Sequence, residues 1–413
     1  MNRNIFLVIL ILFLSIFVRF YNYSNRINFS GEQGLALGVS ADYIKDKFTL
    51  LGQKTFLRTT SKGHILFSGS LYNYSLVPLL SIFNYNPYPI TVLFTLLNII
   101  TILISFLIIK KIINFKTAFF YLILFSFNNT MINHSMYIWI LNAIPLIGII
   151  SLFYLWKFSK IQKSIYVLIL GLLSGIGINL EYVYLFTILL IGIIILLKTH
   201  KKVKHLAVYT IGLLIGNWTM VIFDIRHDFY YTKTLWQYFL DTIYHPQQSH
   251  LSYYHFLQYW PLMILFLSII LIKIFRINKT LGLIMILVYL VFNLTSNQVS
   301  FVRAVGMTKG LTYKIVLRAA ENIARDEPKN FNIVDLPDSD FRAYRLRYLV
   351  KNMFNKKPES IENYSNIDTL YIFGQKDFNI NKPQPWEIQT FKAKNIKILS
   401  ELDNNYIVYK LTK

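Results

Sequence analysis

The chain has 413 residues, of which 54% are hydrophobic and 16% aromatic, and it contains 42 Lys and Arg against 20 Asp and Glu. Charged residues make up only 15% of the chain, below the roughly 25% typical of soluble domains, and the absence of Cys excludes disulfides and thiolate chemistry. The many Phe and Tyr residues exclude a disordered chain. A net charge of +22 usually suggests nucleic acid as a partner, so the position of the basic residues matters.

Nine apolar runs approach or reach the roughly 20 residues that cross a membrane as a helix. In chain order they are 4–21, 90–109, 117–132, 137–156, 164–180, 183–197, 206–223, 259–275 and 280–296. The first run ends in Arg19-Phe20-Tyr21 with no small-residue cleavage site after it, which predicts an uncleaved helix rather than a signal peptide. The runs therefore predict a polytopic α-helical membrane protein with about nine transmembrane helices, in a range of roughly 8 to 11.

One further apolar stretch, residues 64–84, is interrupted by Gly69, Asn73 and Pro78. If it does not span, the N-terminus and four short loops without Asp or Glu fall on one side of the membrane. Basic loops mark the cytoplasmic side, so we expect a plasma-membrane protein with a cytoplasmic N-terminus and a re-entrant or interfacial helix at 64–84. The net charge then reflects orientation and contact with membrane lipids, and we expect no nucleic-acid partner. The basic residues of that side are Arg3, Lys110, Lys111, Lys116, Lys157, Lys160, Lys163, Lys198, Lys201, Lys202, Lys204, Lys273, Arg276 and Lys279.

The outer side receives a loop at about 22–89, a loop at 224–258 and everything after residue 297. Polar and apolar residues alternate in the tail, so we expect a transmembrane domain at 1–300 and a small α/β extracytoplasmic domain at 301–413. The predicted strands are 331–336, 368–373, 396–401 and 405–412, and the predicted helices are 309–326 and 339–354. The acids of residues 1–296, all on or near the outer face, are Glu32, Asp42, Asp46, Glu181, Asp224, Asp228 and Asp241.

The first outer loop contains the motif Gly31-Glu32-Gln33-Gly34, shortly after the first predicted span. A carboxylate presented there could act as a general base if its surroundings raise its pKa toward neutrality. The alternative is that Glu32 is a solvated residue near the start of a helix, where the helix dipole favours an acid.

Three other outer positions are candidates for substrate contact. Glu181-Tyr182 lies in a turn between two apolar runs, where an ionisable group is costly and often functional. Lys62, before the interfacial stretch, could contact a phosphate, and Asn142 lies near the start of the fourth run. For each of them a solvated or structural role is the alternative.

A charged cluster, Asp224-Ile225-Arg226-His227-Asp228, directly follows the seventh run. The planar guanidinium of Arg226, with His227 beside it, could clamp a phosphate. The alternative is a solvated ion cluster at the interface. The sequence contains no H-E-x-x-H motif, no P-loop and no dinucleotide-binding glycine motif, so it names no cofactor and leaves a divalent metal open.

Four segments resemble the GT-C membrane glycosyltransferases, in particular the protein O-mannosyltransferase and aminoarabinose transferase group of glycosyltransferase family 39. The resemblance covers about residues 1–300, and the tail from Asn363 to Tyr371 resembles the small outer domain of that family. The four segments are Gly31–Gly34, Phe67–Pro78 (FSGSLYNYSLVP), Ile138-Trp139 through Asn142 to Pro145, and Phe223–His227.

The resemblance implies an inverting transfer of a sugar from a polyprenyl-phosphate donor to an acceptor hydroxyl of a protein, lipid or glycan on the outer face. The acid of the first loop, here Glu32, would be the base, although relatives commonly have an Asp-Glu or Asp-Gln pair. Basic residues near the outer loops would bind the lipid phosphate, with Arg226 and then Lys62 as the best matches. Glu181-Tyr182 follows the fifth predicted span, a position at which relatives often carry a His.

Two other functions stay open. A transporter or flippase of a lipid-linked sugar would also need many spans, but such proteins tend to contain internal repeats, and none is visible here. A catalytically inactive scaffold is the second, since the motif around Glu32 departs from the common one.

Overall fold

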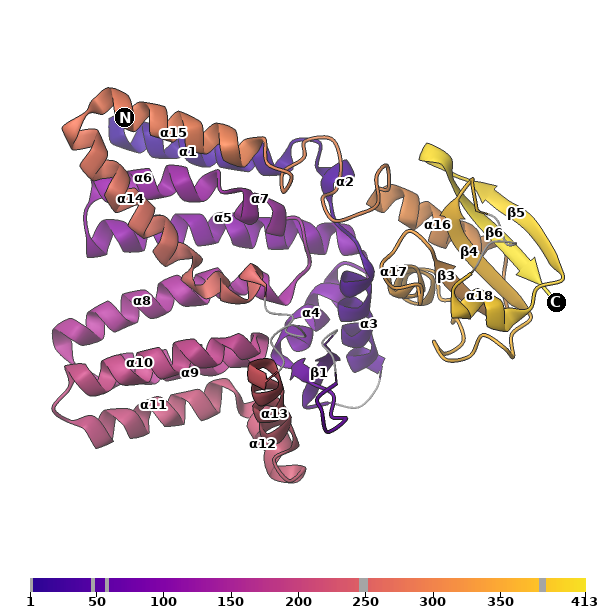
Figure 1. The fold of residues 1–413 in the computed structure, drawn as a ribbon, viewed down its shortest axis with the longest axis horizontal. Helices are drawn as coiled ribbons and strands as arrows, with labels where there is room; N and C mark the ends of the chain where they lie inside the picture. Colours follow the sequence, from indigo (N-terminus) through magenta and orange to yellow (C-terminus); the bar gives the residue numbers. More distant parts are fainter. Residues whose placement is uncertain (1–2, 46–48, 56–58, 245–251, 379–383) are drawn as a thin grey trace.

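The structure, a computed structural model, describes residues 3–45, 49–55, 59–244, 252–378 and 384–413, so the outer acid Asp46 lies outside the described residues. Most of the chain before residue 295 forms helices that lie side by side in one bundle (Figure 1). The C-terminal region, defined here as residues 301–413, forms a small sheet with helices beyond one end of the bundle. The N-terminus lies at the opposite end.

The apolar helices follow the predicted runs. Within the part of the chain that the structure describes, four helical segments are long and apolar enough to cross a membrane: α1 (Arg3–Phe20), α5 (Pro87–Ile112), Ile140–Ile161 and Tyr253–Ile277. The last two contain α8 (Ile144–Ile161) and α14 (Trp260–Ile277). Helix length alone therefore supports four spans, or five with the bent pair described next, and the count of nine stays a prediction. The shorter apolar helices of the bundle are α6 (Phe115–Ser126), α9 (Ser164–Leu180), α10 (Leu185–Lys198) and α15 (Lys279–Leu294).

The seventh predicted run, 206–223, is not one straight helix. It divides into α11 (Lys202–Gly216) and α12 (Trp218–Arg226), whose axes differ by 83°. The break falls at Asn217, whose side-chain oxygen accepts a hydrogen bond of 3.0 Å from Nδ2 of Asn179 in α9. Asp224, Arg226 and His227 therefore lie at the end of a separate helix that is bent away from α11, and whether the two helices form one broken span stays a prediction.

The third run, 117–132, also divides. Helix α6 ends at Ser126, and α7 (Asn129–His134) begins after Asn128, whose side chain accepts from the backbone N–H of Met131. An Asn at this position caps a new helix rather than continuing the old one.

Helices α9 and α11 pack closely because glycines face each other. A Cβ on Gly171 would lie 2.2 Å from the carbonyl oxygen of Tyr209, and one on Gly175 would lie 2.3 Å from that of Leu213. Gly212 and Gly216 face α9 in the same way. Small residues four apart on both helices let the backbones approach, the usual arrangement of tightly packed membrane helices.

The loops predicted to be cytoplasmic lie at one end of the bundle. The connections from α5 to α6, α8 to α9, α10 to α11 and α14 to α15 are all at the end that holds the N-terminus (Figure 1). The acid-free basic clusters are therefore gathered on one side, as the sequence predicts. Which compartment this side faces stays a prediction.

Short elements cover the other end of the bundle. They include a two-stranded antiparallel sheet that pairs Leu51 with Gly69 and Lys54 with Phe67. Helix α4 within the stretch 64–84 has 12 residues, fewer than the roughly 20 that cross a membrane, in line with a non-spanning interfacial helix. The elements are α2 (Tyr23–Arg26), α3 (Gly31–Lys45), β1 (Leu51–Lys54), β2 (Phe67–Gly69), α4 (Leu71–Ile82) and α13 (Tyr230–Tyr244).

The C-terminal region is built on a four-stranded sheet of order β3-β4-β6-β5. Strands β3 and β4 are parallel, and the remaining neighbours are antiparallel. The predicted strands agree with the observed ones within two residues, and the helix predicted at 339–354 is a short helix followed by a π-helical turn. The elements are α16 (Tyr313–Arg325), β3 (Phe331–Asp335), α17 (Tyr344–Tyr348), η5 (Leu349–Met353), β4 (Thr369–Gln375), α18 (Trp386–Phe391), β5 (Asn395–Glu401) and β6 (Tyr406–Thr412).

The two faces of this sheet belong to different cores. On β4, Tyr371 and Phe373 join the hydrophobic cluster that continues into the helix bundle, whereas Leu370 and Ile372 join a separate cluster with α18. This alternation follows from the two-residue period of a strand. The C-terminal region therefore packs against the bundle through one face of its sheet and the helices on it.

Candidate active site

Glu32 owes its position to the way α3 begins. Ser30 precedes the helix, and the side-chain oxygen of Gln33 accepts hydrogen bonds from the backbone N–H of Ser30 at 2.8 Å and from its hydroxyl at 2.7 Å. In a capping box the third helical residue satisfies the residue that caps the helix in this way. Glu32 therefore lies in the first turn of α3, a helix at the end of the bundle nearest the C-terminal region (Figure 1).

The Glu32 side chain lines a cavity of about 230 Å³. Aromatic rings, including Trp139, Tyr231 and Tyr254, form much of its wall. The cavity therefore has the size and mixed lining of a site for a small polar group held against apolar surfaces. Its lining residues with polar or titratable side chains include Glu32, Gln53, Ser68, Asn179, Glu181, Tyr182 and His255.

The surroundings of Glu32 favour its protonated form. The Glu32 side chain is solvent-exposed, but desolvation by the protein around it, and then the negative charge of Asp338, raises its pKa above the ordinary value of 4.5. Tyr72 of α4 lies near enough for the charge of Glu32, after burial, to raise the pKa of its hydroxyl. That hydroxyl is buried and has no hydrogen-bond partner among the described residues. A carboxylate with a raised pKa is suited to accepting a proton.

A second acid of the cavity has a basic partner. Oε1 of Glu181 lies 3.3 Å from Nδ1 of His255, and both side chains are buried. The same Oε1 accepts a hydrogen bond of 3.3 Å from the backbone N–H of Val183. The rings of Tyr182 and Tyr254 lie beside the imidazole, with centroids 5.6 and 4.4 Å away. The imidazole of His255 therefore gives the cavity wall a group that can carry positive charge.

Asn179 fixes one wall of the cavity. Its side-chain oxygen accepts from the backbone N–H of Leu71 at 3.2 Å, and its Nδ2 donates to Asn217 and to Thr219 at 3.0 and 2.9 Å. A Cβ on Gly69 would lie 2.1 Å from Oδ1 of Asn179. The residue therefore ties α4 and the bend between α11 and α12 to the end of α9.

The structure brings together only part of the predicted site. Glu32, Glu181 and Tyr182 line one cavity, although they are far apart in the sequence. Asn142 does not line it, and its amide donates a hydrogen bond of 2.7 Å to the carbonyl of Tyr137. Lys62 is exposed in the turn after β1 and also lies outside the cavity lining.

The charged cluster of α12 is also outside the cavity lining. Arg226 is exposed, and His227 stacks on the ring of Phe223 at 4.2 Å. Asp224 is buried, and its carboxylate accepts from the backbone N–H groups of Tyr231 and Thr232 at 2.7 and 3.1 Å. Asp224 therefore holds the start of α13, and with it the cavity residue Tyr231, in place.

Sequence reasoning missed His255, Asn179 and Asp338. His255 stands just before an apolar run, and the argument applied to Glu181, that an ionisable group beside a span is costly and often functional, would have found it. No sequence signal identifies Asn179 or Asp338, because their roles depend on which elements pack together. Among the residues with described positions, no cluster of three or more His, Asp or Glu side chains could hold a metal ion.

Comparison with known proteins identifies the fold. The crystal structure of ArnT from Cupriavidus metallidurans bound to undecaprenyl phosphate matches 98% of this chain and 97% of its own, with a TM-score of 0.53 and 9% identity. The chain therefore has the GT-C glycosyltransferase fold. This confirms the resemblance stated above, and the GT-C fold and its apolar helices are those of a membrane protein.

Two further structures with the GT-C fold align less closely. The apo state of the same ArnT covers 98% of this chain and 97% of its own at 10% identity, with a TM-score of 0.46. The oligosaccharyltransferase of Archaeoglobus fulgidus, in a complex with Zn and sulfate, covers 89% of this chain and 67% of its own at 10% identity, with a TM-score of 0.47. No protein-family model and no curated protein sequence matches the chain.

Proposed function

We propose that this protein is a membrane glycosyltransferase that moves a sugar from a polyprenyl-phosphate donor to an acceptor hydroxyl on the outer face of the membrane. The observation that carries the proposal is the carboxylate of Glu32, which opens into a polar cavity in surroundings that raise its pKa. The GT-C fold supports the reaction class, and the structural relative ArnT was crystallised with undecaprenyl phosphate.

In this proposal Glu32 is the general base. Its carboxylate takes the proton of the acceptor hydroxyl while the acceptor oxygen forms a bond to the anomeric carbon of the sugar. The bond from that carbon to the phosphate oxygen breaks, and its electron pair leaves with the polyprenyl phosphate. Attack opposite the leaving group inverts the anomeric centre. The raised pKa helps because a general base works best when its pKa is near the working pH.

The departing phosphate needs hydrogen-bond donors or a positive charge, since negative charge develops there. We assign this role first to His255, which is paired with Glu181 in the cavity wall, and to the neighbouring hydroxyl of Tyr254. Arg226, His227 and Lys62 lie outside the lining, so we propose them only as contacts of the lipid phosphate at the membrane surface.

An apolar groove next to the cavity supports a lipid donor. Tyr182 lines both, and the groove has a volume of about 70 Å³ between α10 and α13. Val183, Leu235 and Phe239 are among the side chains that line it. We propose that the first isoprene units of the donor lie here, while the phosphate and sugar occupy the polar cavity.

The test is a transfer assay with purified protein, a panel of polyprenyl-phosphate sugars and membrane extract as the source of acceptor. Wild type is compared with Glu32→Gln, which keeps the size of the side chain and removes the base. We expect transfer of one of the sugars by wild type and its loss in the variant. Flipping of the donor in liposomes without transfer would favour a flippase, and full cellular function of Glu32→Gln would favour a scaffold.

A further inference from the structure

The two glycines around Glu32 are contact points for the C-terminal region. A Cβ on Gly34 would lie 2.4 Å from both the Cα and the backbone nitrogen of Arg345 in α17. A Cβ on Gly31 would lie 3.2 Å from Oδ1 of Asp338. The first turn of α3 therefore rests directly on the loop and helix that follow β3, and the glycines permit this approach.

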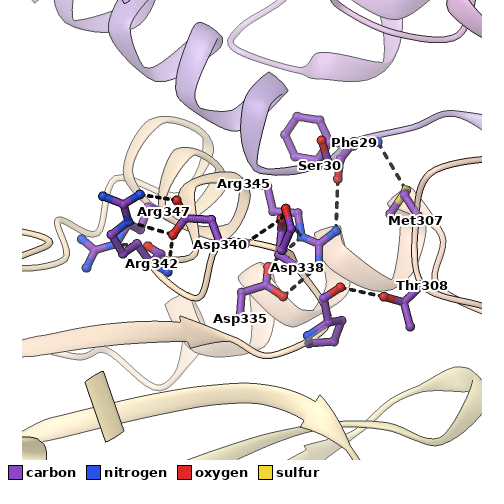
Figure 2. A network of polar contacts seen from close by, with 12 residues as sticks. Phe29, Ser30, Met307, Thr308, Asp335, Asp338, Asp340, Arg342, Arg345 and Arg347 are labelled. Carbon is purple, nitrogen blue, oxygen red and sulfur yellow. Dashed lines mark hydrogen bonds and ion pairs between the residues drawn. The ribbon is translucent and has the colours of Figure 1, made fainter. Parts of the chain in front are cut away.

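A buried ion network lies beneath that turn (Figure 2). Arg345 donates from Nε and Nη2 to the two carboxylate oxygens of Asp335 at 2.6 and 2.8 Å, and its Nε lies 3.2 Å from Oδ2 of Asp338. Its Nη1 donates to the carbonyl of Phe29 at 3.4 Å, just before α3. The guanidinium of Arg345 lies against two carboxylates, and that of Asp338 is the one that approaches Gly31.

Other titratable side chains near Glu32 come from α4, from the segment after α7 and from the cavity wall. Tyr72 of α4 and Tyr137, which follows α7, both lie near Glu32. Burial is the main cause of the raised pKa of each phenol. Glu181 and His255 line the same cavity, with Oε1 of the first 3.3 Å from Nδ1 of the second. After desolvation, the negative charge of Asp338 is the cause that raises the pKa of Glu32, although Asp338 belongs to a different part of the chain.

We propose that Asp338 is a positioning residue for the catalytic base: through it, the C-terminal region supports the first turn of α3 and sets how readily Glu32 takes a proton. The C-terminal region is then part of the catalytic unit rather than a separate appendage. This inference rests on the proposed function, because it assigns a role to a partner of the base. The physical cause is that a like charge nearby disfavours a second carboxylate and makes it hold a proton more tightly.

The first test does not need transfer activity. The carbonyl band of protonated Glu32 is followed by infrared spectroscopy across pH in membrane discs, as the difference between proteins with and without Glu32→Gln. Asp338→Asn keeps the shape and removes the charge, and we expect the Glu32 midpoint to move to lower pH. Asp340→Asn is the matched control, because Asp340 lies in the same loop but pairs with Arg342. An unmoved midpoint in Asp338→Asn, or an equal shift in Asp340→Asn, would overturn the proposal.

The second test uses the transfer reaction. We expect the acid limb of the pH profile of kcat/KM to move to lower pH in Asp338→Asn and to stay in place in Asp340→Asn. A loss of protein stability alone would lower the amount of active enzyme without moving the limb. If wild type transfers no sugar, the proposed function fails, and the infrared titration still decides whether Asp338 acts on Glu32.

Discussion

The Nδ1 atom of His255 lies 3.3 Å from Oε1 of Glu181, and both side chains are buried in the wall of the cavity into which Glu32 opens. His255 precedes α14 and Glu181 follows α9, so the contact joins the ends of two helices of the bundle. Burying an ionised carboxylate is costly unless such a partner pairs with it.

This pair gives the first prediction. His255→Ala leaves Glu181 buried without its basic partner and should lower the free energy of unfolding by about 1–3 kcal/mol. The double variant with Glu181→Gln and His255→Gln should recover part of this stability, because it removes the unpaired charge. Thermal unfolding in detergent measures both. Equal stability of His255→Ala and wild type would show that the pair contributes nothing to the free energy of unfolding.

The contact between α3 and α17 gives a second prediction, with a control in the same helix. Gly34→Ala places a methyl group 2.4 Å from the backbone of Arg345 and should cost about 1–3 kcal/mol of stability through overpacking. Gly38 has no atom within 4 Å of the position of its Cβ, so Gly38→Ala should stabilise the protein by about 0.5–1 kcal/mol. Opposite signs are expected in thermal unfolding, and two stabilising substitutions would contradict the docking of the C-terminal region.

A third prediction concerns stability and pH. Because the pKa of Glu32 is raised in the folded protein, folding favours its protonated form, and this contribution is fully present below the unfolded pKa. It is lost as the pH rises through the raised pKa of the folded state. Glu32→Gln should therefore be more stable than wild type at neutral pH and equally stable at acidic pH. A melting-temperature difference that is the same at every pH would contradict the pKa shift.

The apolar groove gives a fourth prediction. Phe239→Ser places a polar group where we expect the first isoprene units, so it should raise KM for long-chain donors several-fold and spare donors with a very short chain. Trp236→Ser is the control, because Trp236 is exposed on the same helix and does not line the groove. Equal effects of the two substitutions, or no dependence on chain length, would contradict this place for the lipid.

Much of the architecture could be predicted from the sequence. Apolar runs predict the bundle helices, because the membrane requires continuous apolar helices, and alternation predicts the strands of the C-terminal region. The 83° bend at Asn217 was not predicted, since the apolar run continues across it and only the Gly216-Asn217 pair, a common helix end, marks the break.

The candidate site could be predicted only in part. Glu32 and Glu181 stand out as acids beside apolar runs, and both line the cavity. Arg226 also stands out, but the bend before α12 moves it out of the cavity lining. Asp338 and Arg345 belong to a distant segment, and only the packing of α17 on α3 brings them to Glu32. Contacts of this kind depend on the tertiary fold and leave no local pattern in the sequence.

The most direct test of the central claim is the rate of sugar transfer from a polyprenyl-phosphate donor by wild type and by Glu32→Gln, at equal amounts of folded protein. We expect loss of at least two orders of magnitude in kcat, the usual contribution of a general base, with donor binding retained, since the cavity wall is unchanged. Glu32→Asp should retain part of the activity, because it keeps the carboxylate. Transfer by Glu32→Gln at the wild-type rate would contradict the account.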